Sequence, residues 1–98
     1  MTIEIKRNTN ETTIVLVGRL DTLTAPALEK TIADSIDSNE NLVLDFKRLE
    51  YISSAGLRVL LGAQKRLQKS GSMKLVNVSE DVMEVFEMTG FADILTIE

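Results

Sequence analysis

Two adjacent serines carry the most chemical information in this sequence. Ser53 and Ser54 follow an apolar stretch and precede Gly56, at a point where the pattern predicts the start of a helix. A serine at a helix start accepts a hydrogen bond from a backbone N–H that has no helical partner, which stabilises the helix by about 1 kcal/mol. An exposed serine there can also carry a phosphate, whose charge is favoured by the helix dipole and the free amides. A structural role and a regulatory role are both open on these residues alone.

A hydrolase built on these serines is excluded by composition. The chain contains no histidine and no cysteine, which removes the Ser-His-Asp triad, the thiolate nucleophile and the common zinc sites. A nucleophile elbow also needs glycine two positions before the serine, where this chain has Ile52. The remaining enzymatic alternative uses carboxylates only, and requires Asp21, Asp45 and Glu50 to converge in a pocket. Asp45 and Glu50 lack the clustered spacing of a dedicated Mg²⁺ site, so we expect no metal and no cofactor.

Charge and length limit the other classes of function. The 98 residues include 11 Lys and Arg against 15 Asp and Glu, a net charge of −4 that repels nucleic acid. The segment Met1–Ile5 carries an acid where a signal peptide needs bases, and no apolar run approaches the ~18 residues of a transmembrane helix. We therefore expect a cytoplasmic protein without membrane insertion. With 44% apolar residues and no repeat or linker, residues 1–98 are predicted to form a single domain.

The strands that must position the serines follow from the hydrophobic pattern. Alternating and β-branched residues predict an N-terminal hairpin, with strands over 2–7 and 12–17, a turn over 8–11 and an end at Gly18. The short apolar run Leu42–Leu44, ended by Asp45, is typical of a central strand that is buried on both faces. Two further strands are predicted over 75–78 and 94–97.

Helical periodicity predicts three helices between these strands. The first has Thr24 as its N-cap and ends near Asp37 to Asn41, and the second runs from Ser54 to Ser70 with Gly71 as its stop. The third begins at Ser79, a cap residue, and ends at Gly90 in the left-handed conformation. The order β-β-α-β-α-β-α-β predicts an α/β protein with a mixed β-sheet and helices packed against it.

The sequence resembles the STAS domains, specifically the single-domain bacterial anti-sigma-factor antagonists. The resemblance covers nearly the whole chain and includes the order of the elements. The matching residues are Gly18-Arg19-Leu20-Asp21, and Leu42–Asp45 followed by Tyr51-Ile52-Ser53-Ser54-Ala55-Gly56-Leu57. The resemblance implies the STAS-like mixed sheet. It also implies that the serine two positions before the glycine, Ser54, is phosphorylated by an anti-sigma factor that is a serine kinase, and that a protein phosphatase reverses the modification.

This resemblance implies a binding switch rather than an enzyme. The unphosphorylated protein is expected to sequester the anti-sigma factor and so release a sigma factor for transcription. The expected partner-binding residues are Asp21, Ser53, Gly56 and Arg58. A loop aspartate such as Asp21 more commonly caps the local backbone, and the basic stripe of Arg58, Lys65 and Lys69 is most often a solvated helix face. The alternative within the same fold is a STAS subunit of a lipid-transport or stress-signalling complex, without sigma-factor regulation.

Overall fold

One mixed sheet, in the order β1-β2-β3-β4, organises the computed structural model, which describes residues 1–37 and 39–98. Strand β1 (Thr2–Arg7) pairs antiparallel with β2 (Thr12–Leu20), which confirms the predicted hairpin. Strand β3 (Asn41–Ile52) lies parallel to β2 on one side and to β4 (Ser72–Val76) on the other. The mixed sheet predicted from the sequence is therefore confirmed.

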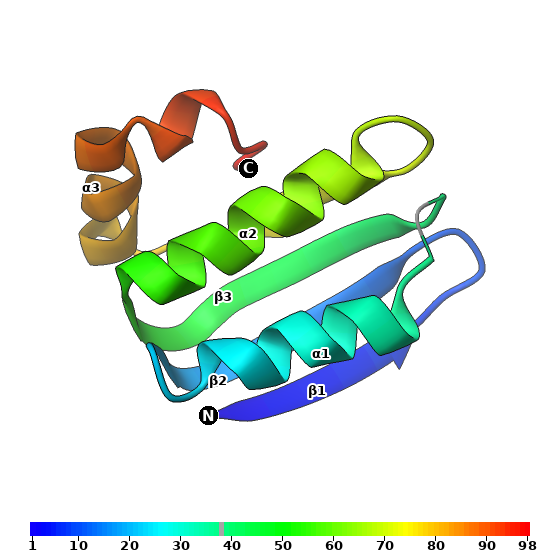
Figure 1. Cartoon of the computed structure of the whole chain (residues 1–98), viewed down its shortest axis with the longest axis horizontal. Helices are drawn as coiled ribbons and strands as arrows, with labels where there is room; N and C mark the ends of the chain where they lie inside the picture. Colours follow the sequence, from blue (N-terminus) through cyan, green and yellow to red (C-terminus); the bar gives the residue numbers. More distant parts are fainter. Residues whose placement is uncertain (38) are drawn as a thin grey trace.

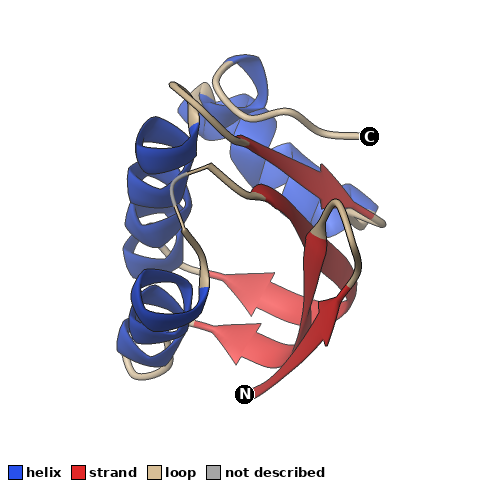
Figure 2. Ribbon diagram, turned by 90° about the vertical axis from the view of Figure 1, so that its right-hand side faces the viewer, coloured by secondary structure: helices blue, strands red, loops and turns tan. Residues whose placement is uncertain are grey.

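The helices α1 (Ala25–Ser35) and α2 (Ser54–Leu67) lie side by side on one face of the sheet (Figures 1 and 2). Helix α3 (Glu80–Thr89) follows β4, and its first turns pack against the last residues of β3. Ser79 caps α3 by accepting a hydrogen bond from the amide of Val82 at 3.2 Å, and Gly90 ends it with φ 82°, as predicted. The element order therefore matches the prediction up to the end of α3.

Buried side chains of the helices and of the central strands form one core. The predicted apolar stripes of α1 and α2 face the sheet. In β3, Leu42, Val43 and Leu44 are all buried, as expected for a central strand that is buried on both faces. Phe46 of β3 also meets Phe86 of α3, with ring centroids 6.2 Å apart. This contact joins α3 to the rest of the core.

Strands β2 and β3 both continue past the ends that the sequence predicted. The prediction ended β2 at Gly18 and β3 at Asp45, whereas β2 reaches Leu20 and β3 reaches Ile52. The pairing register slips twice over this stretch, so β3 carries an extra residue at each irregularity. Gly18 adopts φ 103° at the second one, a conformation that glycine accepts readily. These irregularities break the alternation of inward-facing and outward-facing residues along β3. The hydrophobic pattern of the sequence therefore did not indicate that the strand continues beyond Asp45.

The C-terminal segment departs most from the prediction. A strand was expected over 94–97, but a 3-10 turn spans Phe91–Asp93 and only Ile97 forms a bridge, with Leu75 of β4. The single residue pair does not make a strand. Smaller differences are that α1 ends at Ser35 and α2 at Leu67, and that β4 lies three residues earlier than expected at its start. Ser38, within the predicted end region of the first helix, lies outside the described residues.

Candidate functional site

The ends of β2 and β3 bring the two sequence motifs to the same edge of the sheet. The strands are parallel, and Leu20 is paired with Ile52. The amide of Ser53 then donates a hydrogen bond to the carbonyl oxygen of Leu20 at 2.9 Å. Asp21, in the loop after β2, and Ser54, at the start of α2, therefore lie at the same edge, although they are far apart in the sequence.

The two serines have different environments. Ser54 is the first residue of α2 and is exposed, whereas Ser53, at the N-cap position, is half-buried. The hydroxyl oxygen of Ser53 is buried and has no hydrogen-bond partner within the described part of the chain. Neither serine side chain caps the helix, because no side-chain cap is present at this end of α2 among the described residues. The capping role proposed for these serines is therefore absent, and only Ser54 offers its hydroxyl to solvent.

Gly56 lies where the start of α2 approaches the sheet most closely. It is buried, and a Cβ atom placed on it would lie 2.7 Å from Cγ of Leu20 and 2.9 Å from Cγ1 of Ile52. Contacts this short are closer than van der Waals packing allows. The missing side chain lets α2 approach both strands closely, and the expected role of Gly56 in partner binding stays a prediction.

Asp21 organises the loop that follows β2. Its Oδ1 atom accepts hydrogen bonds from the amides of Leu23 at 3.0 Å and Thr24 at 3.1 Å. The Thr24 hydroxyl accepts from the amide of Asp21 at 2.9 Å and donates to the carbonyl of Arg19 at 2.7 Å, so Thr24 occupies the N-cap position without capping α1. Burial alone would raise the pKa of Asp21, but the hydrogen bonds from Thr24 and Leu23 and the nearby Arg19 together hold it below its ordinary value. The local structural role of Asp21 is therefore present, and a contact with a partner stays a prediction.

Exposed apolar groups flank these loops, and the sequence analysis missed them. The side chain of Leu23 is 88% exposed beside Asp21, and Tyr51 is 42% exposed two residues before Ser53. The guanidinium of Arg19 lies over the ring of Tyr51, 4.2 Å from its centroid. The exposure of Leu23 could have been suspected from the sequence, because it is an apolar residue within the otherwise polar loop 21–24. The exposed leucine and tyrosine side chains that flank these segments are suited to binding a protein surface.

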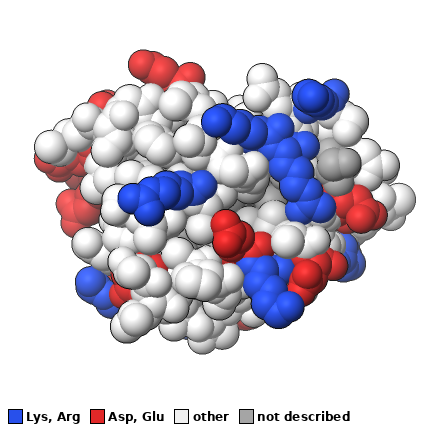
Figure 3. Space-filling view, viewed as in Figure 1, with Lys and Arg blue, Asp and Glu red and all other residues white. Residues whose placement is uncertain are grey.

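Basic side chains lie along α2 from its first half to its far end (Figure 3). Arg58, Lys65 and Lys69 are exposed, as predicted, and none of them forms an ion pair within the described residues. Arg66 is different, because its guanidinium donates to the carbonyl of Ile32 at 3.1 Å and also to that of Ile36 at the end of α1. The three unpaired cations are available to an external group.

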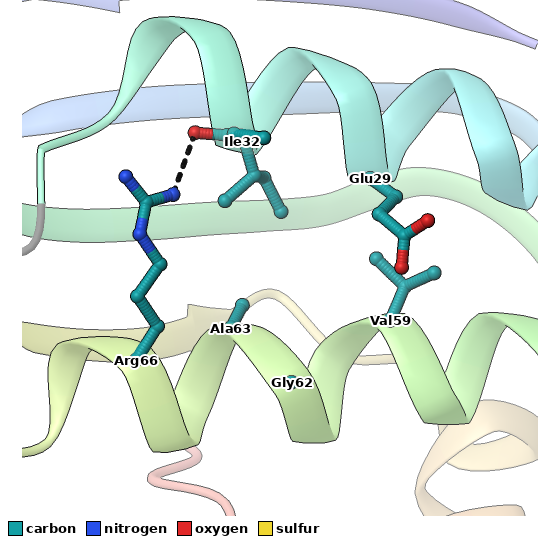
Figure 4. A pocket seen from close by; sticks show the side chains of 7 residues that line it. Glu29, Ile32, Val59, Gly62, Ala63 and Arg66 are labelled. Carbon is teal, nitrogen blue, oxygen red and sulfur yellow. Dashed lines mark hydrogen bonds between the residues drawn. The ribbon is translucent and has the colours of Figure 1, made fainter.

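A shallow groove of about 220 Å³ separates α1 from α2 (Figure 4). Ile32 and Val59 line it from the two helices, and Arg66 and Glu29 lie toward its ends. Gly62 forms part of its lining, and a Cβ atom there would meet nothing within 4 Å. The groove lies along the helices, and none of its lining residues belongs to the serine or aspartate loops.

The carboxylates considered for catalysis do not converge. Asp45 lies midway along β3, well before the end of the strand that leads to Ser53. Its Oδ1 atom accepts from the amide of Lys47 and the side chain of Asn77, both at 3.0 Å. Glu50 is exposed near the end of β3, and Asp21 is engaged in its own loop. The described residues hold no cluster of three or more carboxylates placed for a metal ion, and none of their helices is long and apolar enough to cross a membrane.

Comparisons with known proteins agree with this geometry. A family model described as STAS domain matches residues 2–98. The anti-sigma-B factor antagonist of Bacillus subtilis is 32% identical over 97% of this chain and 88% of its own length. The crystal structure of an anti-sigma factor antagonist from Mycobacterium paratuberculosis superposes with a TM-score of 0.88 at 24% identity, covering 98% of this chain and 83% of that one. The Bacillus cell fate determinant SpoIIAA in the phosphorylated form gives a TM-score of 0.75 at 24% identity, over 99% and 91%.

Proposed function

The chain belongs to the STAS domain family, and on that basis we propose that it is an anti-sigma-factor antagonist controlled by phosphorylation of Ser54. The observation that carries the proposal is the exposed Ser54 at the start of α2, on the same sheet edge as the Asp21 loop. The name of the relative from Bacillus subtilis, an anti-sigma-B factor antagonist, supports the identity of the partner.

The unphosphorylated protein binds the anti-sigma factor through this edge. Leu23 and Tyr51 supply exposed apolar area, and Asp21 and Arg58 supply charges around Ser54. Occupation of the anti-sigma factor by this surface releases the sigma factor that it held. The protein acts by binding and competition, and the carboxylates have no shared site from which to perform catalysis.

Phosphorylation of Ser54 reverses the switch. A phosphoserine carries a charge of about −1.5 to −2 at neutral pH. Removing that charge from water in the complex costs several kcal/mol, and about 4 kcal/mol corresponds to roughly a thousandfold in affinity. The kinase in this proposal is the anti-sigma factor itself, and a separate phosphatase restores the binding form. SpoIIAA, which shares this fold, has been solved in a phosphorylated form, so the fold is compatible with the modification.

The environment of the serines supports Ser54, rather than Ser53, as the acceptor. A kinase must place the serine hydroxyl in line with the γ-phosphate of ATP. The hydroxyl oxygen of Ser53 is buried, whereas Ser54 is exposed on the first turn of α2. Phosphorylation of Ser53 would require the loop to open first.

The decisive experiment uses an anti-sigma factor with kinase activity from the organism that encodes this protein. The purified kinase is incubated with the protein and ATP, the modified residue is located by mass spectrometry, and binding is measured by calorimetry before and after modification. We expect one phosphate on Ser54 and a loss of binding of at least a hundredfold. Binding that is absent in both forms, or that is unaffected by the phosphate, would contradict the proposal.

A further inference from the structure

Arg58 lies one helical turn after Ser54 on the same face of α2. Both residues belong to α2 and both are exposed. Residues four apart in a helix have Cβ atoms about 5–6 Å from each other. Helical side chains also lean toward the N-terminus, so the side chain of the later residue covers the preceding turn. The guanidinium of Arg58 can therefore reach a group attached to the Ser54 oxygen.

The charge of Arg58 is not used inside the described part of the protein. Its side chain takes part in none of the side-chain hydrogen bonds or ion pairs of the described residues, whereas the side chains of Arg19 in β2 and Arg66 in the last turn of α2 are engaged. The acids on neighbouring elements are Asp21 on the β2–α1 loop, Glu50 at the end of β3, and Glu80 and Asp81 at the start of α3. Asp21 pairs with Arg19, and none of these acids pairs with Arg58. No internal carboxylate has to be displaced before Arg58 can bind a phosphate.

We propose that Arg58 forms an intrahelical ion pair with the phosphate on Ser54, an inference that rests on the proposed modification of that residue. Guanidinium and phosphate match as bidentate partners, and such charge-assisted pairs are stronger than neutral hydrogen bonds. The pair holds the phosphate against α2 and occupies Arg58 in the phosphorylated form. Phosphorylation therefore changes the binding surface in two ways. It adds negative charge at Ser54, and it makes the guanidinium of Arg58 unavailable to a partner.

The test uses the full chain with phosphoserine installed at position 54 during translation, so that it does not depend on any kinase. The second pKa of the phosphate is followed by ³¹P NMR in the wild type, in Arg58→Gln and in Lys65→Gln. Lys65 is the matched control, because it lies on the same helix at about 16 Å from Ser54 along the axis. We expect the pKa to rise by about half a unit in Arg58→Gln and to stay at the wild-type value in Lys65→Gln.

Thermal unfolding of the wild type and Arg58→Gln, each with and without the phosphate, gives an independent measure of the same ion pair. Arg58→Gln is expected to leave the Tm of the unphosphorylated protein unchanged and to lower that of the phosphorylated protein by about 2 to 4 °C. An unchanged phosphate pKa in Arg58→Gln, an equal shift in Lys65→Gln, or an equal Tm loss in both phosphorylation states would overturn the ion pair. A kinase that leaves Ser54 unmodified would instead contradict the proposed function, and the NMR result would still stand.

Discussion

The amide of Ser53 donates a hydrogen bond to the carbonyl oxygen of Leu20, and this 2.9 Å contact fixes the start of α2 beside the end of β2. It continues the parallel pairing of β2 and β3 by one more residue beyond Ile52. The two loops that leave these strands are held together by backbone atoms. Substitution of the side chains at Asp21 or Ser54 is therefore expected to alter the surface while leaving the relative position of the loops intact.

The two serines are expected to respond differently to alanine. Ser54→Ala should abolish phosphorylation, and Ser53→Ala should retain it, because the Ser53 hydroxyl is buried. Since that hydroxyl has no partner within the described residues, its removal should leave the free energy of unfolding unchanged or raise it slightly. Mass spectrometry and denaturant unfolding check the two effects. Labelling that is lost in Ser53→Ala and kept in Ser54→Ala would place the modification one residue earlier.

Two glycines of α2 provide a matched pair. Gly56→Ala should destabilise the protein by about 1–3 kcal/mol, because its Cβ would overlap Leu20 and Ile52. Gly62→Ala should stabilise it by about 0.5–1 kcal/mol, because the Cβ enters open space and alanine favours a helix interior. Urea unfolding of both variants gives the comparison. Equal effects at the two positions would show that α2 does not approach the sheet as described.

Asp21→Ala is expected to lower the Tm by a few degrees, because the amides of Leu23 and Thr24 lose their acceptor. Asp21→Asn keeps an oxygen in the same place and should recover most of the loss. Thermal unfolding measures the stability, and calorimetry with the anti-sigma factor measures the contribution to binding. If Asp21→Asn weakens binding at unchanged stability, the charge itself contacts the partner. A Tm that does not change in Asp21→Ala would contradict the capping role.

Leu23 is expected to be a major contributor to partner binding. Its side chain is 88% exposed, so Leu23→Ser should leave the stability almost unchanged. Loss of a buried apolar contact at the interface should weaken binding about tenfold or more. Met88, which is 80% exposed at the far end of α3, supplies the control substitution Met88→Ser. Comparable losses of affinity in the two variants would argue against an interface at the edge of the sheet where β2 and β3 end.

Glu40 should make the stability sensitive to acid. The amide of Asp37 and the hydroxyl of Thr12 donate to its carboxylate, and with Arg7 they hold the pKa of Glu40 below its ordinary value. A lowered pKa means that the stabilisation is complete at neutral pH and is lost as the pH falls below about 4.3, the value for an unfolded glutamate.

The variant Glu40→Gln should therefore be less stable than the wild type by about 1 kcal/mol at pH 7, and the difference should shrink near pH 3. Chemical denaturation at the two pH values measures it. Glu29→Gln, at an exposed glutamate on α1 without an ion pair among the described residues, is the control substitution. If the difference in the free energy of unfolding grows on acidification, the pKa of Glu40 is not lowered by folding and the prediction is wrong.

The local parts of this fold follow from the sequence because they depend on neighbouring residues. The hairpin was predicted from alternation and turn residues, and the apolar run Leu42–Leu44 identified a strand buried on both faces. Ser79 and Gly90 marked the ends of α3 because a cap and a positive φ involve only the adjacent turn. The residues Ser54 and Asp21 were also available from the sequence, through motif resemblance and their positions after strands.

The tertiary structure decided what depends on contacts between distant segments. The slipped register of β2 and β3 lengthened both strands, because pairing satisfied backbone groups that the side-chain pattern had assigned to loops. The packing of α2 buried the hydroxyl of Ser53 and exposed Ser54, a difference that two identical side chains cannot encode locally. It also made Gly56 a point of close approach to β2 and β3. The sequence by itself determined which elements form and which groups they carry, whereas only the assembled sheet and helices determined which of those groups are exposed at the end of β2 and β3.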